Sequence, residues 1–156
     1  MKERKVETFV YEGLGFPVTL IKCPMKKVFG EWVLDINLAK LQLDMLKALI
    51  HKPVPLTGSE LRFIRKYLEL SATAFGKLVG VSHPAVLKWE KDQAHISPPT
   101  EIYIRLYVLQ NLQAKDKEFR NLYEEISIEN LIKHKNDKQV PLSIMLGDNS
   151  LLSASA

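Results

Sequence analysis

The chain has 156 residues, of which 46% are hydrophobic and 26% are charged, a globular composition that argues against intrinsic disorder. Its 22 Lys and Arg residues exceed its 18 Asp and Glu residues by a formal charge of +4, a mild excess that suits a polyanionic partner. The single cysteine, Cys23, excludes an intrachain disulfide and a secreted disulfide scaffold. With no apolar run of the roughly 18 residues that cross a bilayer, and no signal peptide, we expect a cytoplasmic protein without membrane contact.

The first 36 residues carry the pattern of short β-strands. Stretches rich in β-branched and aromatic residues predict strands at Val6–Tyr11, Val18–Ile21, Val28–Phe29 and Glu31–Ile36. From Leu38 the apolar residues recur at helical spacing, and this helix ends before Pro53 because a residue that precedes proline avoids the α region. We therefore expect a small α+β unit, strands followed by a helix, over residues 1–52.

Beyond a proline-containing linker the pattern becomes helical. Three helices are each preceded by a residue that caps helix N-termini: Thr57, Ser71 and Ser82. Glu60 completes a capping box with Thr57, and two prolines after Ser97 start a fourth helix that extends to about Gln113. We expect these helices to form one domain over residues 57–113.

The last part of the chain, residues 114–156, contains two more helical patterns, Asp116–Ile126 and Glu129–Lys135. After Gly147 the residues are small and polar, which is typical of a mobile tail. The predicted fold class is therefore mainly α, with a small N-terminal α+β unit and a C-terminal helical extension.

The second and third helices of the central domain are joined by a short turn. Gly80 can adopt the positive φ that ends one helix, Val81 is a buried pivot, and Ser82 caps the next helix. Gly76 is small enough for the two helices to cross closely. A short helix held in this way projects its N-terminal turn, as helices that enter the DNA major groove do.

Several residues carry this pattern together: Arg65, Phe75, Gly76, the turn Gly80–Ser82, Val86, Trp89 and Glu90. At these positions the sequence resembles the XRE (lambda-repressor-like) helix-turn-helix family. The resemblance covers residues 57–113 and implies a helix-turn-helix bundle in a sequence-specific DNA-binding transcriptional regulator, most simply a repressor. It also implies that Arg65 pairs with Glu90 as a structural contact, and that Trp89 belongs to the core.

The resemblance implies that eight residues contact DNA: Ser71, Ala72, Thr73, Ser82, His83, Pro84, Leu87 and Lys88. The N-terminus of the second helix would face the phosphate backbone. Lys88 is able to reach a guanine edge or a phosphate, and the alternative is a solvated lysine. His83 either contacts a base or a phosphate, or is a surface side chain that makes no DNA contact. Pro84 has no backbone N–H to donate, so we expect it to start the helix and to make van der Waals contact only.

A second resemblance covers the N-terminal unit from Tyr11 to Leu49. Strands, a helix, a proline linker and an XRE module follow one another as in the MqsA-like antitoxins. That family holds zinc through paired CxxC motifs, which this sequence lacks, since it has Cys23 alone. We therefore expect no metal site. Within the regulator class, the sharper hypothesis is an autoregulating antitoxin that also binds a partner toxin.

The fourth helix is apolar nearly all round, through Ile102, Tyr103, Ile104, Leu106, Tyr107, Val108, Leu109 and Leu112. A helix of this kind must be covered on several sides. We expect a homodimer, because DNA-binding proteins of this type commonly read paired half-sites as dimers.

No catalytic motif, nucleotide-binding glycine loop or cofactor motif occurs in the sequence, so we expect neither an enzyme nor a cofactor. Double-stranded DNA is the expected partner. One alternative is a protein-interaction module that keeps the helix-turn-helix fold without binding DNA. Another is a small basic nuclease, which the missing metal and acid–base motifs disfavour.

Overall fold

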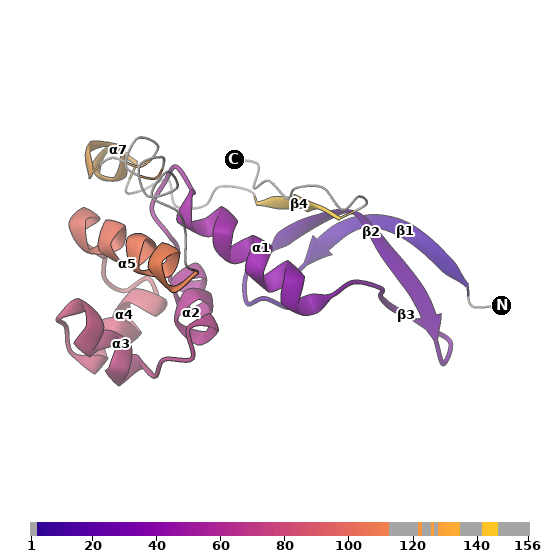
Figure 1. The fold of residues 1–156 in the computed structure, drawn as a ribbon, viewed down its shortest axis with the longest axis horizontal. Helices are drawn as coiled ribbons and strands as arrows, with labels where there is room; N and C mark the ends of the chain where they lie inside the picture. The colour runs from indigo at the N-terminus through magenta and orange to yellow at the C-terminus, as the bar shows by residue number, and fades with distance from the viewer. Residues whose placement is uncertain (1–2, 113–121, 123–125, 127, 135–141, 147–156) are drawn as a thin grey trace. The chain divides into compact units, whose positions relative to one another are not determined.

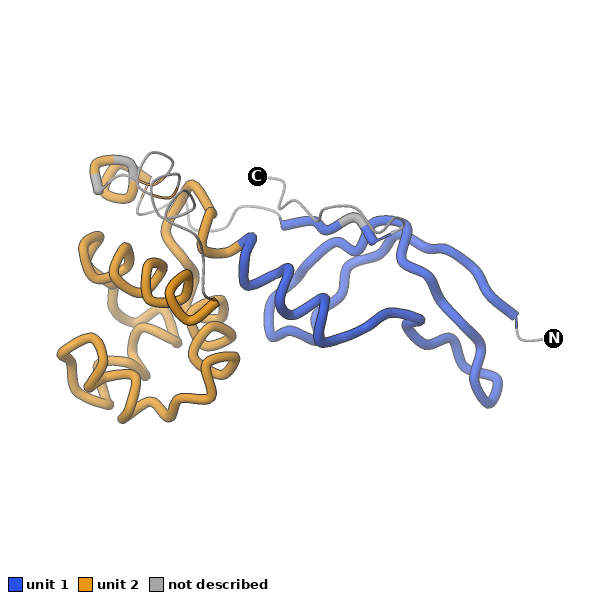
Figure 2. Tube along the Cα trace, in the orientation of Figure 1, with its two compact units in different colours: residues 1–48, 141–156 blue, residues 49–140 orange. Residues whose placement is uncertain are grey.

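The computed structural model describes residues 3–112, 122, 126, 128–134 and 142–146, and these residues form two compact units (Figures 1 and 2). Residues 1–48 and 141–156 belong to the first unit, and residues 49–140 belong to the second. The described residues contain six helices and a four-stranded mixed sheet, so the fold class is α+β. The prediction of a mainly α chain with a C-terminal helical extension is therefore wrong. Two features of the sheet explain the difference: one strand is longer than predicted, and another comes from the C-terminal part of the chain.

The first unit, which we call the sheet unit, has its strands in the order β1-β2-β3, with β4 paired to β2. Its elements are β1 (Arg4–Tyr11), β2 (Val18–Val28), β3 (Glu31–Leu34), β4 (Ser143–Met145) and most of α1 (Leu38–Ile50). The side chains of Val18, Leu20, Cys23 and Met25 alternate into the core along β2, as a half-buried strand requires. The stripe of α1 that contains Leu41, Met45 and Leu46 is buried as well.

Strand β2 is longer than predicted and is the first reason for the correction. The sequence predicts two short strands here, Val18–Ile21 and Val28–Phe29, with residues 22–27 between them. Antiparallel β1 and β3 flank this segment instead and pair with it. Lys22 adopts a positive φ of 52° beside a register shift between Glu7 and Phe9, so the irregular residue is absorbed as a bulge.

Strand β4 is the second reason. It lies parallel to β2, with Thr19 opposite Ser143 and Ile21 opposite Met145. The backbone N–H of Thr19 donates to Leu142 O at 2.9 Å, and that of Leu146 donates to Ile21 O at 3.0 Å. The C-terminal part thus contributes a strand to the sheet, not only a helix. Pairing between such distant segments leaves no local signal in the sequence.

The second unit, which we call the helical unit, contains α2 (Gly58–Tyr67), α3 (Ala72–Val79), α4 (His83–Glu90), α5 (Pro98–Asn111) and α7 (Ile128–Lys133). The three predicted N-caps are confirmed, since the side chains of Thr57, Ser71 and Ser82 each accept a backbone N–H of the following turn. Ser97 caps α5 in the same way, ahead of the two prolines that were predicted to start this helix. The capping box of Thr57 and Glu60 is also present. The predicted helix Asp116–Ile126 lies almost entirely outside the described residues, as does the predicted mobile tail.

Two ion pairs are buried inside the helical unit. Lys52 Nζ lies 2.6 Å from Glu60 Oε1, and Arg105 Nη2 lies 2.7 Å from Glu101 Oε2. Burial lowers the pKa of Lys52 and of Arg105, although each carboxylate partner raises it. These charges are tolerated because each has an opposite charge at hydrogen-bonding distance.

Arg105 also connects α5 to the linker that precedes α2. It donates to the carbonyl oxygens of Ile50 at 3.2 Å, Lys52 at 2.6 Å and Val54 at 2.9 Å. The carboxylate of Glu101 in turn accepts the backbone N–H of Leu56 at 3.1 Å. The linker of the helical unit is therefore fixed by side chains of α5, in place of a regular backbone ladder.

Much of the apolar surface of α5 is buried within a single chain. Ile102, Ile104, Val108 and Leu109 are buried, and Tyr103 is the one large apolar side chain of this helix that is exposed, at 49%. The surplus of apolar surface that predicted a partner subunit is thus mostly accounted for by packing inside the helical unit, which includes contacts of α5 with α3 and α7.

Candidate nucleic-acid interface

The turn between α3 and α4 is built by backbone geometry that the sequence specifies. Gly80 adopts φ 77° and ψ 29° at the end of α3, a left-handed conformation that glycine occupies without steric cost. The backbone N–H of Val81 donates to Gly76 O at 2.8 Å, which closes the turn. Ser82 then accepts the backbone N–H of Ala85 at 3.4 Å and starts α4. Two helices of eight residues therefore meet in a helix-turn-helix arrangement.

Glycine is required at two close approaches in this unit. A Cβ atom at Gly76 would lie 2.6 Å from Val81 O, so the turn passes directly over α3 at that residue. A Cβ atom at Gly58 would collide with the backbone oxygen of Glu90, which brings the start of α2 against the end of α4. The backbone N–H of Gly58 donates to Asp92 Oδ1 at 3.0 Å and completes this contact.

A nearly buried ion pair ties α2 to the end of α4. Arg65 donates from Nε to Glu90 Oε2 at 2.6 Å and from Nη2 to Glu90 Oε1 at 2.9 Å, a bidentate geometry. Its Nη1 donates to Leu70 O at 3.0 Å, in the segment before α3. The two side chains are only 12% and 5% exposed, and the hydrogen bonds to Glu90 raise the pKa of Arg65. One guanidinium therefore holds α2, the start of α3 and the end of α4 together.

The residues predicted to contact DNA gather at the N-termini of α3 and α4 and along α4. Six of the eight are exposed: Ser71, Thr73, Ser82, His83, Pro84 and Lys88. Leu87 is half-buried, and Ala72 is buried at 8% exposure, so its side chain packs inside the helical unit and only its backbone would face a ligand. Ser71 and Ser82 are occupied as N-caps, through Ala74 and Ala85 respectively.

The inward side of α4 is less buried than the sequence suggested. Val86 is fully buried, whereas Trp89 and Val81 are only half-buried. The prediction that Trp89 is a core residue is therefore only partly confirmed, and Val86 is the buried residue of α4. The two helices also expose lysines at positions 77 and 88, and α2 exposes Arg62 and Lys66.

Sequence reasoning missed the buried Lys52–Glu60 and Glu101–Arg105 pairs. A signal for the second pair was present, because a Glu and an Arg four residues apart interrupt the otherwise apolar α5. Lys52 gave no such signal, since it stands in a linker where a lysine is ordinarily solvated.

Within residues 3–112 and the shorter described segments, no group of three or more His, Cys, Asp and Glu side chains is placed to hold a metal ion. None of the helices in that part of the chain has the length and apolar character needed to cross a membrane. Comparison of the chain with protein-family models, with curated proteins and with solved structures finds no match in any of the three.

Proposed function

We propose that the helical unit binds double-stranded DNA and that the protein is a sequence-specific transcriptional regulator. One observation carries the proposal: the exposed N-terminal turns of α3 and α4 are held in a fixed helix-turn-helix by the Gly76 contact and the Arg65–Glu90 pair. The resemblance of these residues to the XRE family supports it.

The physical basis is the free N–H groups and partial positive charge of a helix N-terminus, which attract phosphate. In α4 the first turn carries His83 and Pro84, and the second carries Lys88, all exposed. A lysine that bonds a base edge contributes about 1–3 kcal/mol of discrimination, whereas one that bonds phosphate strengthens binding to every sequence. Lys88 is the residue that we expect to read a base.

The test is a titration of duplex DNA at several salt concentrations. Because phosphate contacts release counterions, log K is expected to fall with log[salt] by about 0.9 per phosphate contacted. Lys88→Ala should weaken binding without changing thermal stability, and Lys133→Ala, which removes an exposed lysine from α7, is the matched control. Absence of duplex binding by the unaltered protein at about 50 mM salt would contradict the proposal.

The alternative is a protein-interaction module with the same helices and no affinity for DNA. It predicts that Lys88→Ala and Lys133→Ala are equivalent in every duplex assay. The same titration therefore separates the two functions.

A homodimer and a toxin partner remain proposals within the regulator class. Leu109 is 2% exposed in one chain, so a charge there would unfold the helical unit and would report nothing about assembly. Tyr103→Glu is the appropriate variant, since this side chain is 49% exposed on α5. If α5 forms a dimer interface, sedimentation should show a dimer for the unaltered protein and a monomer for Tyr103→Glu. A monomeric unaltered protein at micromolar concentration would contradict the dimer.

A further inference from the structure

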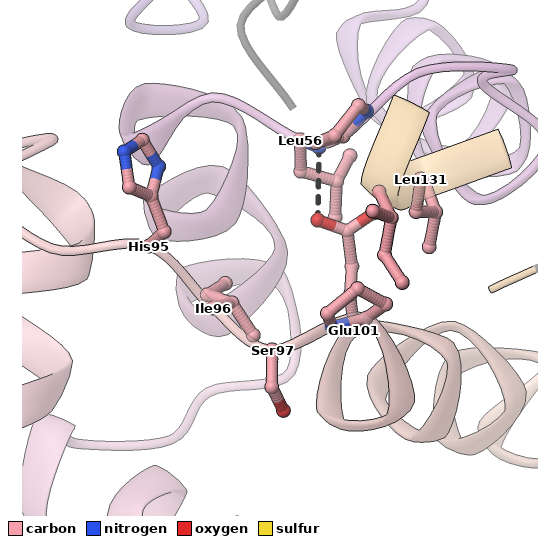
Figure 3. A pocket seen from close by; sticks show the side chains of 9 residues that line it. Leu56, His95, Ile96, Ser97, Glu101 and Leu131 are labelled. Atoms are coloured by element: carbon pink, nitrogen blue, oxygen red, sulfur yellow. Dashed lines mark hydrogen bonds between the residues drawn. The ribbon is translucent and has the colours of Figure 1, made fainter. Parts of the chain in front are cut away.

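The helical unit contains a pocket of about 360 Å³ that is lined by none of the residues of the DNA-binding proposal. Its lining residues come from the linker, from the loop that follows α4, from the start of α5 and from α7: Pro55, Leu56, His95, Ile96, Ser97, Pro98, Glu101, Leu131 and Ile132 (Figure 3). This volume falls at the lower end of the range of about 300–1,000 Å³ for small-molecule sites.

The lining is mostly aliphatic, and one of its polar groups is buried. Glu101 has a residual exposure of 3%, whereas His95 and Ser97 are exposed. Figure 3 shows the Glu101 carboxylate directed toward Leu56, whose backbone N–H it accepts. Its other oxygen accepts Arg105 Nη2 at 2.7 Å. An ionised carboxylate has about four acceptor positions, so these two bonds do not exhaust the acceptor capacity of Glu101, which is the buried polar side chain of the lining.

The charges around the pocket determine which ligand it would take. The buried charged side chains among the described residues are Lys52, Glu60, Glu101 and Arg105, two cations and two anions. Besides Glu101, the ionisable side chain of the lining is His95, which is exposed and does not belong to this buried set. A cationic ligand would therefore be a third buried cation, and an anionic ligand would meet the carboxylate of Glu101. A neutral ligand avoids both costs.

We propose that this pocket binds a small, neutral, mainly apolar molecule that donates an N–H or O–H group to Glu101. The apolar body of the ligand would pack against the aliphatic lining, and its donor would bond a carboxylate that Arg105 already holds in place. This proposal does not depend on DNA binding, because none of the residues that line the pocket belongs to α3 or α4 and the ligand is of a different class.

The test uses indole as a neutral bicyclic N–H donor and N-methylindole as a matched probe without the donor. Binding is measured by ligand-observed NMR at millimolar concentration of each probe. A hydrogen bond to a charged acceptor predicts that N-methylindole binds at least about ten-fold more weakly than indole. Equal binding of the two probes would overturn the assignment of a donor ligand.

Two variants on α7 locate the site. Ile132 lines the pocket and is 56% exposed, so Ile132→Trp should fill the pocket from its open side without disturbing the core. Lys133 is exposed and does not line the pocket, so Lys133→Trp is the matched control. We expect Ile132→Trp to abolish indole binding and Lys133→Trp to retain it, with thermal unfolding confirming that both variants fold. Equal binding by both folded variants, or no binding of indole to the unaltered protein, would overturn the proposal.

Discussion

Among the described residues, the ion pairs of the sheet unit lie at or near the surface, and those of the helical unit lie inside. The side chains of Lys27 and Glu3 are 38% and 64% exposed, whereas those of Arg105 and Glu101 are 0% and 4% exposed. An exposed pair contributes about 0–1 kcal/mol, because water screens the charges and both side chains lose entropy. A buried pair is different: loss of one partner leaves an uncompensated charge in a region of low dielectric.

The difference follows from what each unit must hold together. In the sheet unit, β1 and β3 satisfy the backbone of β2 through regular ladders, and apolar side chains fill the core. In the helical unit, a guanidinium is the partner of the carbonyl oxygens of Ile50, at the end of α1, and of Lys52 and Val54 in the linker. Among the described residues, buried charge thus occurs where backbone polar groups lack a strand to pair with.

The largest effect is expected for Arg105→Met. This change keeps most of the side-chain volume but leaves Glu101 unpaired and the linker carbonyls without a donor, so the free energy of unfolding should fall by about 3–5 kcal/mol. Urea unfolding measures it. Of the two tryptophans, Trp32 belongs to the sheet unit and Trp89 to the helical unit, so a Trp32→Phe background reports the helical unit alone.

The matched control is Lys40→Met in the sheet unit, which removes one partner of the Lys40–Asp44 pair, whose side chains are 57% and 18% exposed. Because this pair belongs to the sheet unit, its effect is followed through Trp32 in a Trp89→Phe background. It should change stability by no more than about 0.5 kcal/mol. Equal effects of the two substitutions would show that burial does not distinguish the two classes of ion pair.

A smaller effect is expected for the pair that holds the helix-turn-helix. A double-mutant cycle of Arg65→Ala and Glu90→Ala should give a coupling energy of about 2 kcal/mol, because the contact is bidentate and nearly buried. The same cycle on Lys40 and Asp44 should give less than about 0.5 kcal/mol. Additive effects at Arg65 and Glu90 would mean that the pair does not stabilise this arrangement of α2 and α4.

The helical unit was the more predictable of the two from sequence. The start of each helix depends on a capping residue and the three residues that follow it, as at Thr57 and Glu60. The turn between α3 and α4 depends on the positive φ of Gly80. Such signals are local, so the sequence contains them directly. The predicted contact residues at the starts of α3 and α4 are exposed for the same reason, with Ala72 the exception.

The sheet unit was less predictable because its structure depends on distant pairing. The continuity of β2 through Lys22 and Pro24 results from the strands on either side, and β4 pairs with residues more than 100 positions earlier in the chain. The burial of Lys52 has the same origin, since Glu60 and α5 surround it only after folding. The residue types alone do not predict these long-range contacts.

The smallest effect concerns alkaline pH, where we expect the two units to respond in opposite directions. In the sheet unit, burial, followed by the nearby carboxylate of Glu7, raises the pKa of the Cys23 thiol above its ordinary value of 9.0. The unfolded chain then loses this proton first, so the sheet unit should lose stability as the pH rises above about 9. In the helical unit, burial lowers the pKa of Lys52 below 10.5 despite its bond to Glu60.

For Lys52 the change of the free energy of unfolding with pH has the opposite sign. The reason is that, just below pH 10.5, the folded state has released the proton while the unfolded chain still holds it. The free energy of unfolding of the helical unit should therefore increase with pH in the window just below 10.5. Urea titrations from about pH 8.5 to about pH 10.5, followed through Trp32 and Trp89 separately, measure both slopes. Cys23→Ala should flatten the slope of the sheet unit only, and Lys52→Met should flatten that of the helical unit only. If the units unfold together, the two slopes add, and each substitution still removes its own contribution. Parallel slopes in the unaltered protein that neither substitution changes would contradict the assignment of these two buried groups.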